Sequence, residues 1–178
     1  MYALRQTVPG LEGFADYQVV PERPENADAI EALVDLDFGP ERFRKTAYRL
    51  RDGVAPIAEL SFVAMERTRL IGTIRFWPVN IAEQPGLLLG PLAIAPDHQG
   101  RGIGQALMHA GLDAAKGQGW GAVILVGDEP YYRRFGFQRT LVENLTLPGP
   151  VNADRFLGLE LIPGAIGNAS GMVSRITP

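Results

Sequence analysis

The sequence contains no cysteine among its 178 residues. This absence excludes disulfide bonds, cysteine-ligated zinc and a thiol nucleophile. Histidine is nearly absent too, since only His98 and His109 are present, and neither has carboxylates at ligand spacing around it. We therefore expect one ordinary loop residue, one helix-surface residue and no metal site.

Long apolar runs and clusters of one charge are also missing. No segment approaches the ~20 apolar residues of a membrane span, and no basic segment followed by an apolar core marks a signal peptide at the N-terminus. The 17 basic and 20 acidic residues are scattered and leave a net charge of -3. These features argue against a membrane or nucleic-acid partner and lead us to expect a cytoplasmic protein.

The chain length and composition fit one domain. With 178 residues, 46% of them hydrophobic, the chain can bury about two thirds of its unfolded surface in a single core. No repeat or linker divides it, so we expect one domain over residues 1–178.

The most informative stretch runs from Leu87 to Gln105. Residues 87–94 form an apolar run of strand length that ends near Pro96, and an amphipathic helix is expected from Gly102 to about Gly117. Between them lies the segment Gln99–Gly104, here called the glycine loop. Its glycines expose the first-turn amides at the positive end of the helix dipole, which suits a phosphate or pyrophosphate. The alternative is that this segment is only a glycine-containing turn between the strand and the helix, with no ligand.

Two other phosphate-binding motifs do not fit. The P-loop pattern GxxxxGK[ST] occurs nowhere in the chain. The dinucleotide pattern GxGxxG or GxGxxA fails at its last position, whether it starts at Gly100 or at Gly102. Nucleoside triphosphate and dinucleotide chemistry are therefore disfavoured.

Two motifs, in the expected order along the chain, resemble those of the GNAT superfamily of N-acetyltransferases. The similarity is greatest to bacterial proteins that are predicted to be N-acetyltransferases. The glycine loop, QGRGIG, matches the acyl-CoA-binding motif [QR]-x-x-G-x-[GA], and Tyr131–Phe137, YYRRFGF, matches a downstream [FY]-Y-x-x-x-G-[FY] motif. The resemblance implies an α/β fold, a GNAT-like acyl-CoA N-acyltransferase fold. Its central mixed β-sheet is flanked by helices around a strand–helix–strand–helix core.

The rest of the chain predicts further elements of such a fold. We expect helices at about 26–38 and 41–51, and strands at 16–21, 58–65, 70–77 (ending at Pro78), 87–94, 122–126, 137–145, 156–162 and 172–176. The apolar strands 87–94 and 122–126 should pair in parallel, and 137–145 with 156–162 antiparallel. The second helix carries Arg42, Arg44, Lys45, Arg49 and Arg51. These residues form either a face toward an acidic substrate or a solvated helix face, and the resemblance places the helical pair on the acceptor side.

The resemblance also implies the binding residues for acetyl-CoA, the expected cosubstrate, with no metal required. Backbone groups of Leu92, Ala93 and Ile94 would bond the pantetheine arm as an added strand does. The pyrophosphate would lie on the glycine loop and the helix start, at Gln99, Gly100, Arg101, Gly102, Ile103, Gly104 and Gln105. Arg101 and Arg133 could add charge, although both could also be exposed arginines without a partner.

Acetyl transfer from a thioester to an amine needs a proton donor for the departing thiolate and a neutral amine. The resemblance assigns the donor role to Tyr132, whose alternative is a half-buried packing residue. Some members of the family carry a glutamate base on the central strand, but Leu87, Leu88 and Leu89 occupy that region here. The resemblance therefore assigns no general base. Glu129 is our candidate base by location, beside Asp128 and Glu59, and a water chain to solvent is the alternative.

The sequence thus predicts an acetyl-CoA-dependent N-acyltransferase that acts on a primary amine of a small molecule, peptide or protein by direct transfer in a ternary complex. A non-catalytic acyl-CoA sensor or interaction domain and an unrelated nucleotide-binding protein are the alternatives. The acceptor carries no recognisable motif. The glycine-rich tail and late strands permit a homodimer without requiring one.

Overall fold

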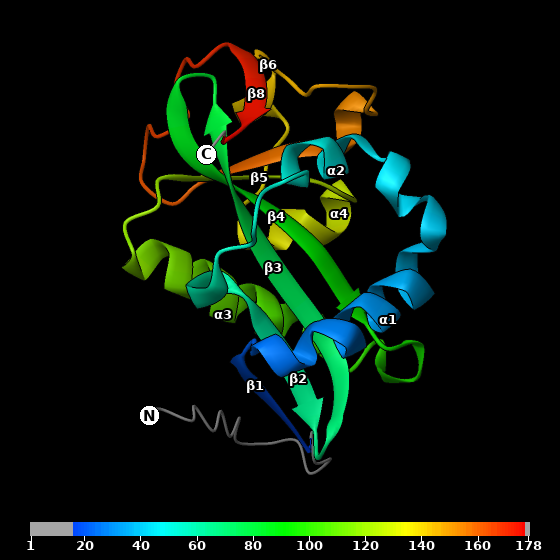
Figure 1. The fold of residues 1–178 in the computed structure, drawn as a ribbon. Helices are drawn as coiled ribbons and strands as arrows, with labels where there is room; N and C mark the ends of the chain where they lie inside the picture. The colour runs from blue at the N-terminus through cyan, green and yellow to red at the C-terminus, as the bar shows by residue number, and fades with distance from the viewer. Residues whose placement is uncertain (1–15, 177–178) are drawn as a thin grey trace.

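The computed structural model describes residues 16–176, so the expectation about a signal peptide falls on residues outside this range. Its main sheet has the strand order β1-β2-β3-β4-β5-β7 (Figure 1). These strands are β1 (Tyr17–Pro21), β2 (Phe62–Glu66), β3 (Arg69–Ile81), β4 (Gln84–Ile94), β5 (Ala122–Val126) and β7 (Phe156–Glu160). Two further strands, β6 (Leu145–Thr146) and β8 (Gly171–Arg175), pair with each other, and β8 also pairs with the end of β3.

The main sheet is mixed, as predicted. All its neighbouring strands pair antiparallel except β4 and β5, which are parallel and are joined through α3 (Ile103–Gly117). A parallel pair needs a crossover of this length. The predicted order of strand, helix, strand and short helix is completed by α4 (Glu129–Tyr132), directly after β5.

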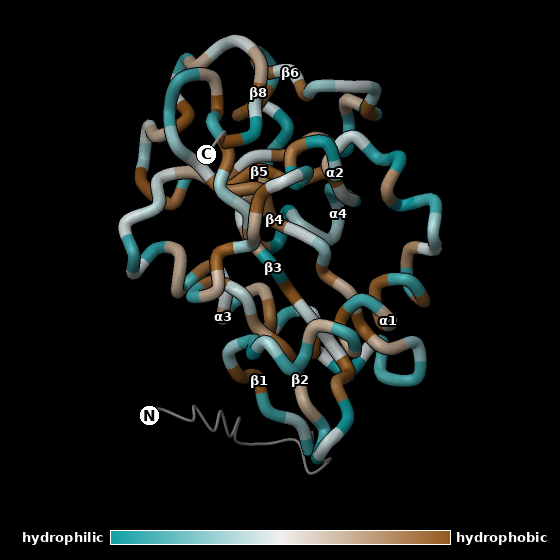
Figure 2. Tube along the Cα trace, in the orientation of Figure 1, coloured by the Kyte–Doolittle hydropathy of each residue, from teal (hydrophilic) through white to brown (hydrophobic). Residues whose placement is uncertain are grey.

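Helices cover both faces of this sheet. Figure 1 shows α1 (Ala27–Phe38) across the lower part of the sheet, α2 (Thr46–Arg51) above it, and α3 to the left of the central strands. The α3 side is apolar, because Ile103 and Leu107 of this helix pack against Gly72 of β3. The core lies along the central strands, where Figure 2 shows hydrophobic residues, and includes Ile74, Phe76 and Leu87.

Three predicted elements were wrong in part. The strand beginning at residue 58 starts at Phe62, after a 3-10 turn, and the helix over 41–51 is a 3-10 segment, Pro40–Arg44, followed by α2. Pro78 does not end β3 but pairs with Leu87. It is tolerated because β8 begins to pair only at Val79, so the outer edge of β3 needs no donor at Pro78.

The predicted pair of 137–145 with 156–162 is also wrong. Only one bridge, between Gln138 and Gly158, joins these segments, and β7 pairs with β5 instead. Residues 140–142 form a 3-10 turn that buries Val142. Within residues 16–176, no helix is long and apolar enough to cross a membrane.

Candidate active site

The parallel strands β4 and β5 separate soon after they meet. Their pairing consists of Leu87 with Val123 and Leu88 with Ile124. Beyond Leu88, β4 continues to Ile94 with its other edge still paired to β3. Among the described residues no strand covers the β5-facing edge of residues 89–94, here called the open edge. Backbone groups on such an edge can accept an added extended chain.

A β-bulge lies at the start of the open edge. Leu92 pairs with Ile74 and Leu89 with Phe76, so Gly90 and Pro91 together oppose the single residue Arg75. Gly90 has a φ of 128°, which favours glycine, and its carbonyl accepts a hydrogen bond of 2.6 Å from the indole Nε1 of Trp77. A bulge bends its strand and redirects neighbouring groups, here where β4 leaves β5.

The glycine loop leads into α3 with free backbone donors. Gly100 and Gly102 have φ values of 78° and 79°, and a Cβ atom on either would point into open space. The hydrogen bond nearest the helix start joins the Ala106 amide to the Gly102 carbonyl. Within the described chain, no backbone amide of residues 100–105 donates to another backbone group. Unpaired donors at the positive end of a helix are an arrangement that suits a phosphate group.

A buried histidine anchors the segment before the glycine loop. The His98 ring nitrogens lie 2.9 Å from Asp97 and 3.0 Å from Glu66 at the end of β2. Hydrogen bonds to Asp97 and Glu66 raise the pKa of His98. Arg69 donates to Asp97 at 2.7 and 2.9 Å, and Arg101 lies 3.6 Å from Glu66.

The expectation of an ordinary loop residue at position 98 was therefore wrong. This burial could not be predicted from neighbouring residues, because the partner Glu66 is 32 positions away. His109 is exposed on α3 as expected. In the part of the chain that the structure describes, no group of three or more histidines and carboxylates could hold a metal ion.

Tyr132, the predicted proton donor, ends α4 and is half-buried. Its ring packs against the Gly127 backbone and lies 5.9 Å from the Phe137 ring. Burial raises the pKa of Tyr132, and the nearby Tyr131 and Asp128 raise it further. The phenol is therefore held in its protonated form, as a proton donor requires.

Tyr131 joins α4 to the start of α3. A Cβ atom on Gly104 would lie 2.6 Å from the Tyr131 hydroxyl, so this phenol occupies the space beside the first turn of α3. The two adjacent tyrosines thus point to different places. Tyr131 supports the helix start, and Tyr132 packs at the end of β5.

The candidate bases lie on or near the same short helix. Glu129 and Asp128 line an open depression of about 590 Å³ together with Tyr131 and Arg155. Asp128 lies 3.3 Å from Arg155, and Glu129 lies 3.8 Å from Arg133, so each arginine has an acidic neighbour. Glu59 is exposed on the 3-10 turn before β2 rather than on a strand.

On the α1 and α2 side, sequence reasoning missed Asp37 and Trp77 and left the role of Arg51 open. Asp37, in the last turn of α1, is close enough for its charge to raise the pKa of Tyr132. Trp77 holds the bulge, and the guanidinium of Arg51, at the end of α2, lies over the Trp77 ring with 5.5 Å between Cζ and the ring centroid. For Arg51, the basic character of the 41–51 segment was the one indication in the sequence of a place near the site.

The splayed parallel strands, the bulge and the glycine-rich helix start are the features of an acyl-CoA N-acyltransferase fold with a mixed sheet. The family model of the acetyltransferase (GNAT) domain matches residues 58–139. The chain is 30% identical over 156 residues to the N-acetyltransferase YhbS of Escherichia coli strain K12, covering 85% of this chain and 92% of the relative.

Solved structures agree with this relationship. The crystal structure of the Escherichia coli GNAT family N-acetyltransferase YhbS in complex with CoA superposes with a TM-score of 0.78 at 26% identity, covering 94% of this chain and 93% of that one. A GNAT family acetyltransferase from Brucella melitensis in complex with acetyl-CoA gives 0.69 at 28% identity, covering 90% and 96%. The protein belongs to the GNAT family and is an acetyltransferase.

Proposed function

We propose that this protein transfers an acetyl group from acetyl-CoA to a primary amine of a small molecule or a peptide, by direct transfer in a ternary complex. The observation that carries the proposal is the row of free amides at residues 100–105 beside the open edge of β4. The two solved relatives, bound to CoA and to acetyl-CoA, support it.

The binding residues follow from this geometry. The open edge at Leu92, Ala93 and Ile94 offers strand-type hydrogen bonds to the two amides of a pantetheine arm. The glycine loop and the first turn of α3, residues 99–105, hold the pyrophosphate through backbone donors. Arg101 adds a positive charge there. Its side chain is 40% exposed, and its one acidic neighbour among the described residues is Glu66, at 3.6 Å.

Acetyl-CoA supplies the activated acetyl thioester. Tyr132 holds the proton that the departing CoA thiolate takes up when the carbon–sulfur bond breaks and the carbon–nitrogen bond forms. Glu129, or water leading to solvent, takes the proton that the attacking amine loses. Because the chain has no cysteine, we infer that the acetyl group passes directly to the amine.

The test is an initial-rate study of CoA release with a panel of primary amines, in which both acetyl-CoA and the amine are varied. Double-reciprocal lines that intersect are expected for a ternary complex, and parallel lines would indicate an acetylated enzyme instead. Tight binding of acetyl-CoA without acceptor-dependent release would contradict the proposal and support the sensor alternative.

A further inference from the structure

Arg51 lies directly against the bulge of β4. A Cβ atom on Gly90 would come within 2.8 Å of its Nη2 atom. The guanidinium carbon is 4.7 Å from the Tyr48 ring centroid and 5.5 Å from that of Trp77. Because Trp77 is itself bonded to the Gly90 carbonyl, the guanidinium is held between two aromatic rings at the start of the open edge.

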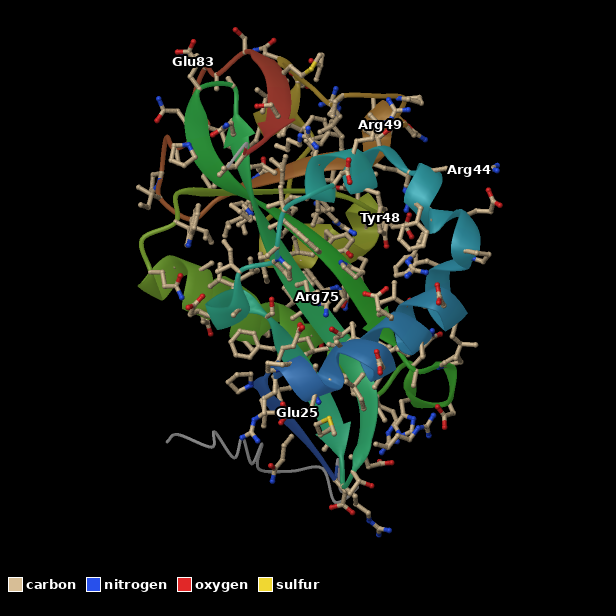
Figure 3. The ribbon with its side chains drawn as sticks, in the orientation of Figure 1. Glu25, Arg44, Tyr48, Arg49, Arg75 and Glu83 are labelled. Atoms are coloured by element: carbon tan, nitrogen blue, oxygen red, sulfur yellow. The ribbon has the colours of Figure 1, made fainter. Side chains whose placement is uncertain are left out.

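Arg51, which is half-buried, differs from the two buried arginines Arg42 and Arg75. Arg75 forms a two-point pair with Glu22 at 2.7 and 2.9 Å and also contacts Glu31. Arg42 pairs with Glu31 and Asp35. Figure 3 shows Arg75 at the middle of β3 and Tyr48 of α2 above it, and the charge of Arg75 is close enough to act on Arg51.

No carboxylate forms an ion pair with Arg51 among residues 16–176, and its buried Nε atom has no hydrogen-bond partner there. Burial lowers the pKa of Arg51 to about 10, although the neighbouring Tyr48 hydroxyl opposes this shift, and the charge of Arg75 adds to it. The group therefore remains a cation at neutral pH. Arg51 is half-buried. A partly desolvated cation without a carboxylate partner carries a cost, and an anion placed beside it would offset that cost.

We propose that Arg51 binds a carboxylate of the acceptor, so that the acceptor is an amine that carries its own carboxylate, as an amino acid does. The planar guanidinium fork matches a carboxylate in two-point geometry. One unpaired cation between two rings balances one negative charge, which favours a carboxylate over a phosphate dianion. The nearby charge of Asp37 at Tyr132 would attract the ammonium end of such a molecule. This inference rests on the proposed function.

The test compares matched acceptors that differ only in the carboxylate. The twenty common amino acids are assayed for CoA release beside the decarboxylated amine or the amide of each. We expect at least one amino acid to exceed its partner by about 30-fold or more in kcat/KM, mainly through KM. A panel without any such preference, in a preparation that binds acetyl-CoA, would overturn the inference and leave the cofactor site intact.

The responsible residue is tested with Arg51→Met, which keeps an apolar stem between the rings, and Arg51→Lys, which keeps the charge. Arg51→Met should bring the ratio of kcat/KM for the preferred amino acid and its decarboxylated partner close to one, and Arg51→Lys should restore part of it. Arg44→Gln, at an exposed arginine paired with Glu41, is the matched control and should keep the ratio of the parent.

Two results distinguish carboxylate binding by Arg51 from a purely structural role of Arg51 and from a failure of the proposed function. An equal loss for both members of the pair in Arg51→Met, with acetyl-CoA affinity and melting temperature retained, would show that Arg51 merely shapes the bulge and would overturn the assignment. A parent protein that fails to bind acetyl-CoA at all would overturn the proposed function first, and the inference with it.

Discussion

The adjacent residues Tyr131 and Tyr132 differ in surroundings and therefore in expected role. We predict that Tyr132→Phe lowers kcat by about a hundredfold or more, the usual contribution of a positioned proton donor, with the acetyl-CoA dissociation constant unchanged. Since the pKa of Tyr132 is raised, its protonated form persists to high pH. The parent should thus show no loss of kcat from phenol ionisation below about pH 10.

Tyr131→Phe is the matched control, because it removes the same atom from the neighbouring ring. It should affect acetyl-CoA binding more than kcat, since the Tyr131 hydroxyl lies against Gly104. Equal losses of kcat in both variants, measured by single-turnover CoA release, would remove the distinct role assigned to Tyr132.

At the scale of single residues, the sequence could indicate groups that belong to local motifs. Tyr132 and the glycine loop are each defined by neighbours within a few positions. Arg51, Asp37 and His98 could not be found in this way, because their surroundings come from other elements. Arg51 meets Trp77 and Gly90 only through the packing of α2 on the sheet, and His98 meets Glu66 only through the hairpin of β2 and β3.

At the scale of elements, the cluster of His98, Asp97 and Glu66 ties the β2–β3 hairpin to the glycine loop. The pKa of His98 is raised above its ordinary value of 6.5. Protonated His98 therefore stabilises the fold fully below that value, and this contribution is lost as pH rises through the raised pKa. We predict that the melting-temperature difference between the parent and His98→Gln shrinks from about pH 6 to about pH 9.

His109→Gln is the control for this series, because His109 is exposed on α3. Its melting temperature should follow that of the parent at every pH. A difference between parent and His98→Gln that grows with pH would contradict the assignment of a protonated, ion-paired His98. Below about pH 5, protonation of Asp97 and Glu66, whose pKa values are lowered, should weaken the cluster as well.

Elements with strong local patterns were predicted closely, and elements that depend on distant partners were not. The apolar run 122–126 is β5, and the helix expected from Gly102 to Gly117 is α3. Residues 137–145 were expected to form a strand beside 156–162, yet β7 pairs with β5 and residues 140–142 form a turn over the core. The splay of β4 from β5 could not be read from composition, because a bulge leaves no clear mark there.

At the scale of the whole molecule, the two sides of the sheet differ in the chemical groups that they present. The side of α3 and the glycine loop presents free backbone donors to phosphate groups, whereas the side of α1 and α2 presents charged side chains around the bulge. The open edge of β4 lies between them. We infer that acetyl-CoA and the acceptor approach from these two sides and meet at Gly90 and Pro91.

Binding of acetyl-CoA, measured by calorimetry, tests this account most directly. A side chain at Gly102 would strain a φ of 79°, so charge reversal at the exposed neighbour Arg101 is the cleaner probe. Micromolar binding to the parent, weakened about tenfold or more in Arg101→Glu and kept in Lys116→Glu at the far end of α3, is the predicted result. No binding to the folded parent, or equal binding by both variants, would contradict the glycine loop as the phosphate site.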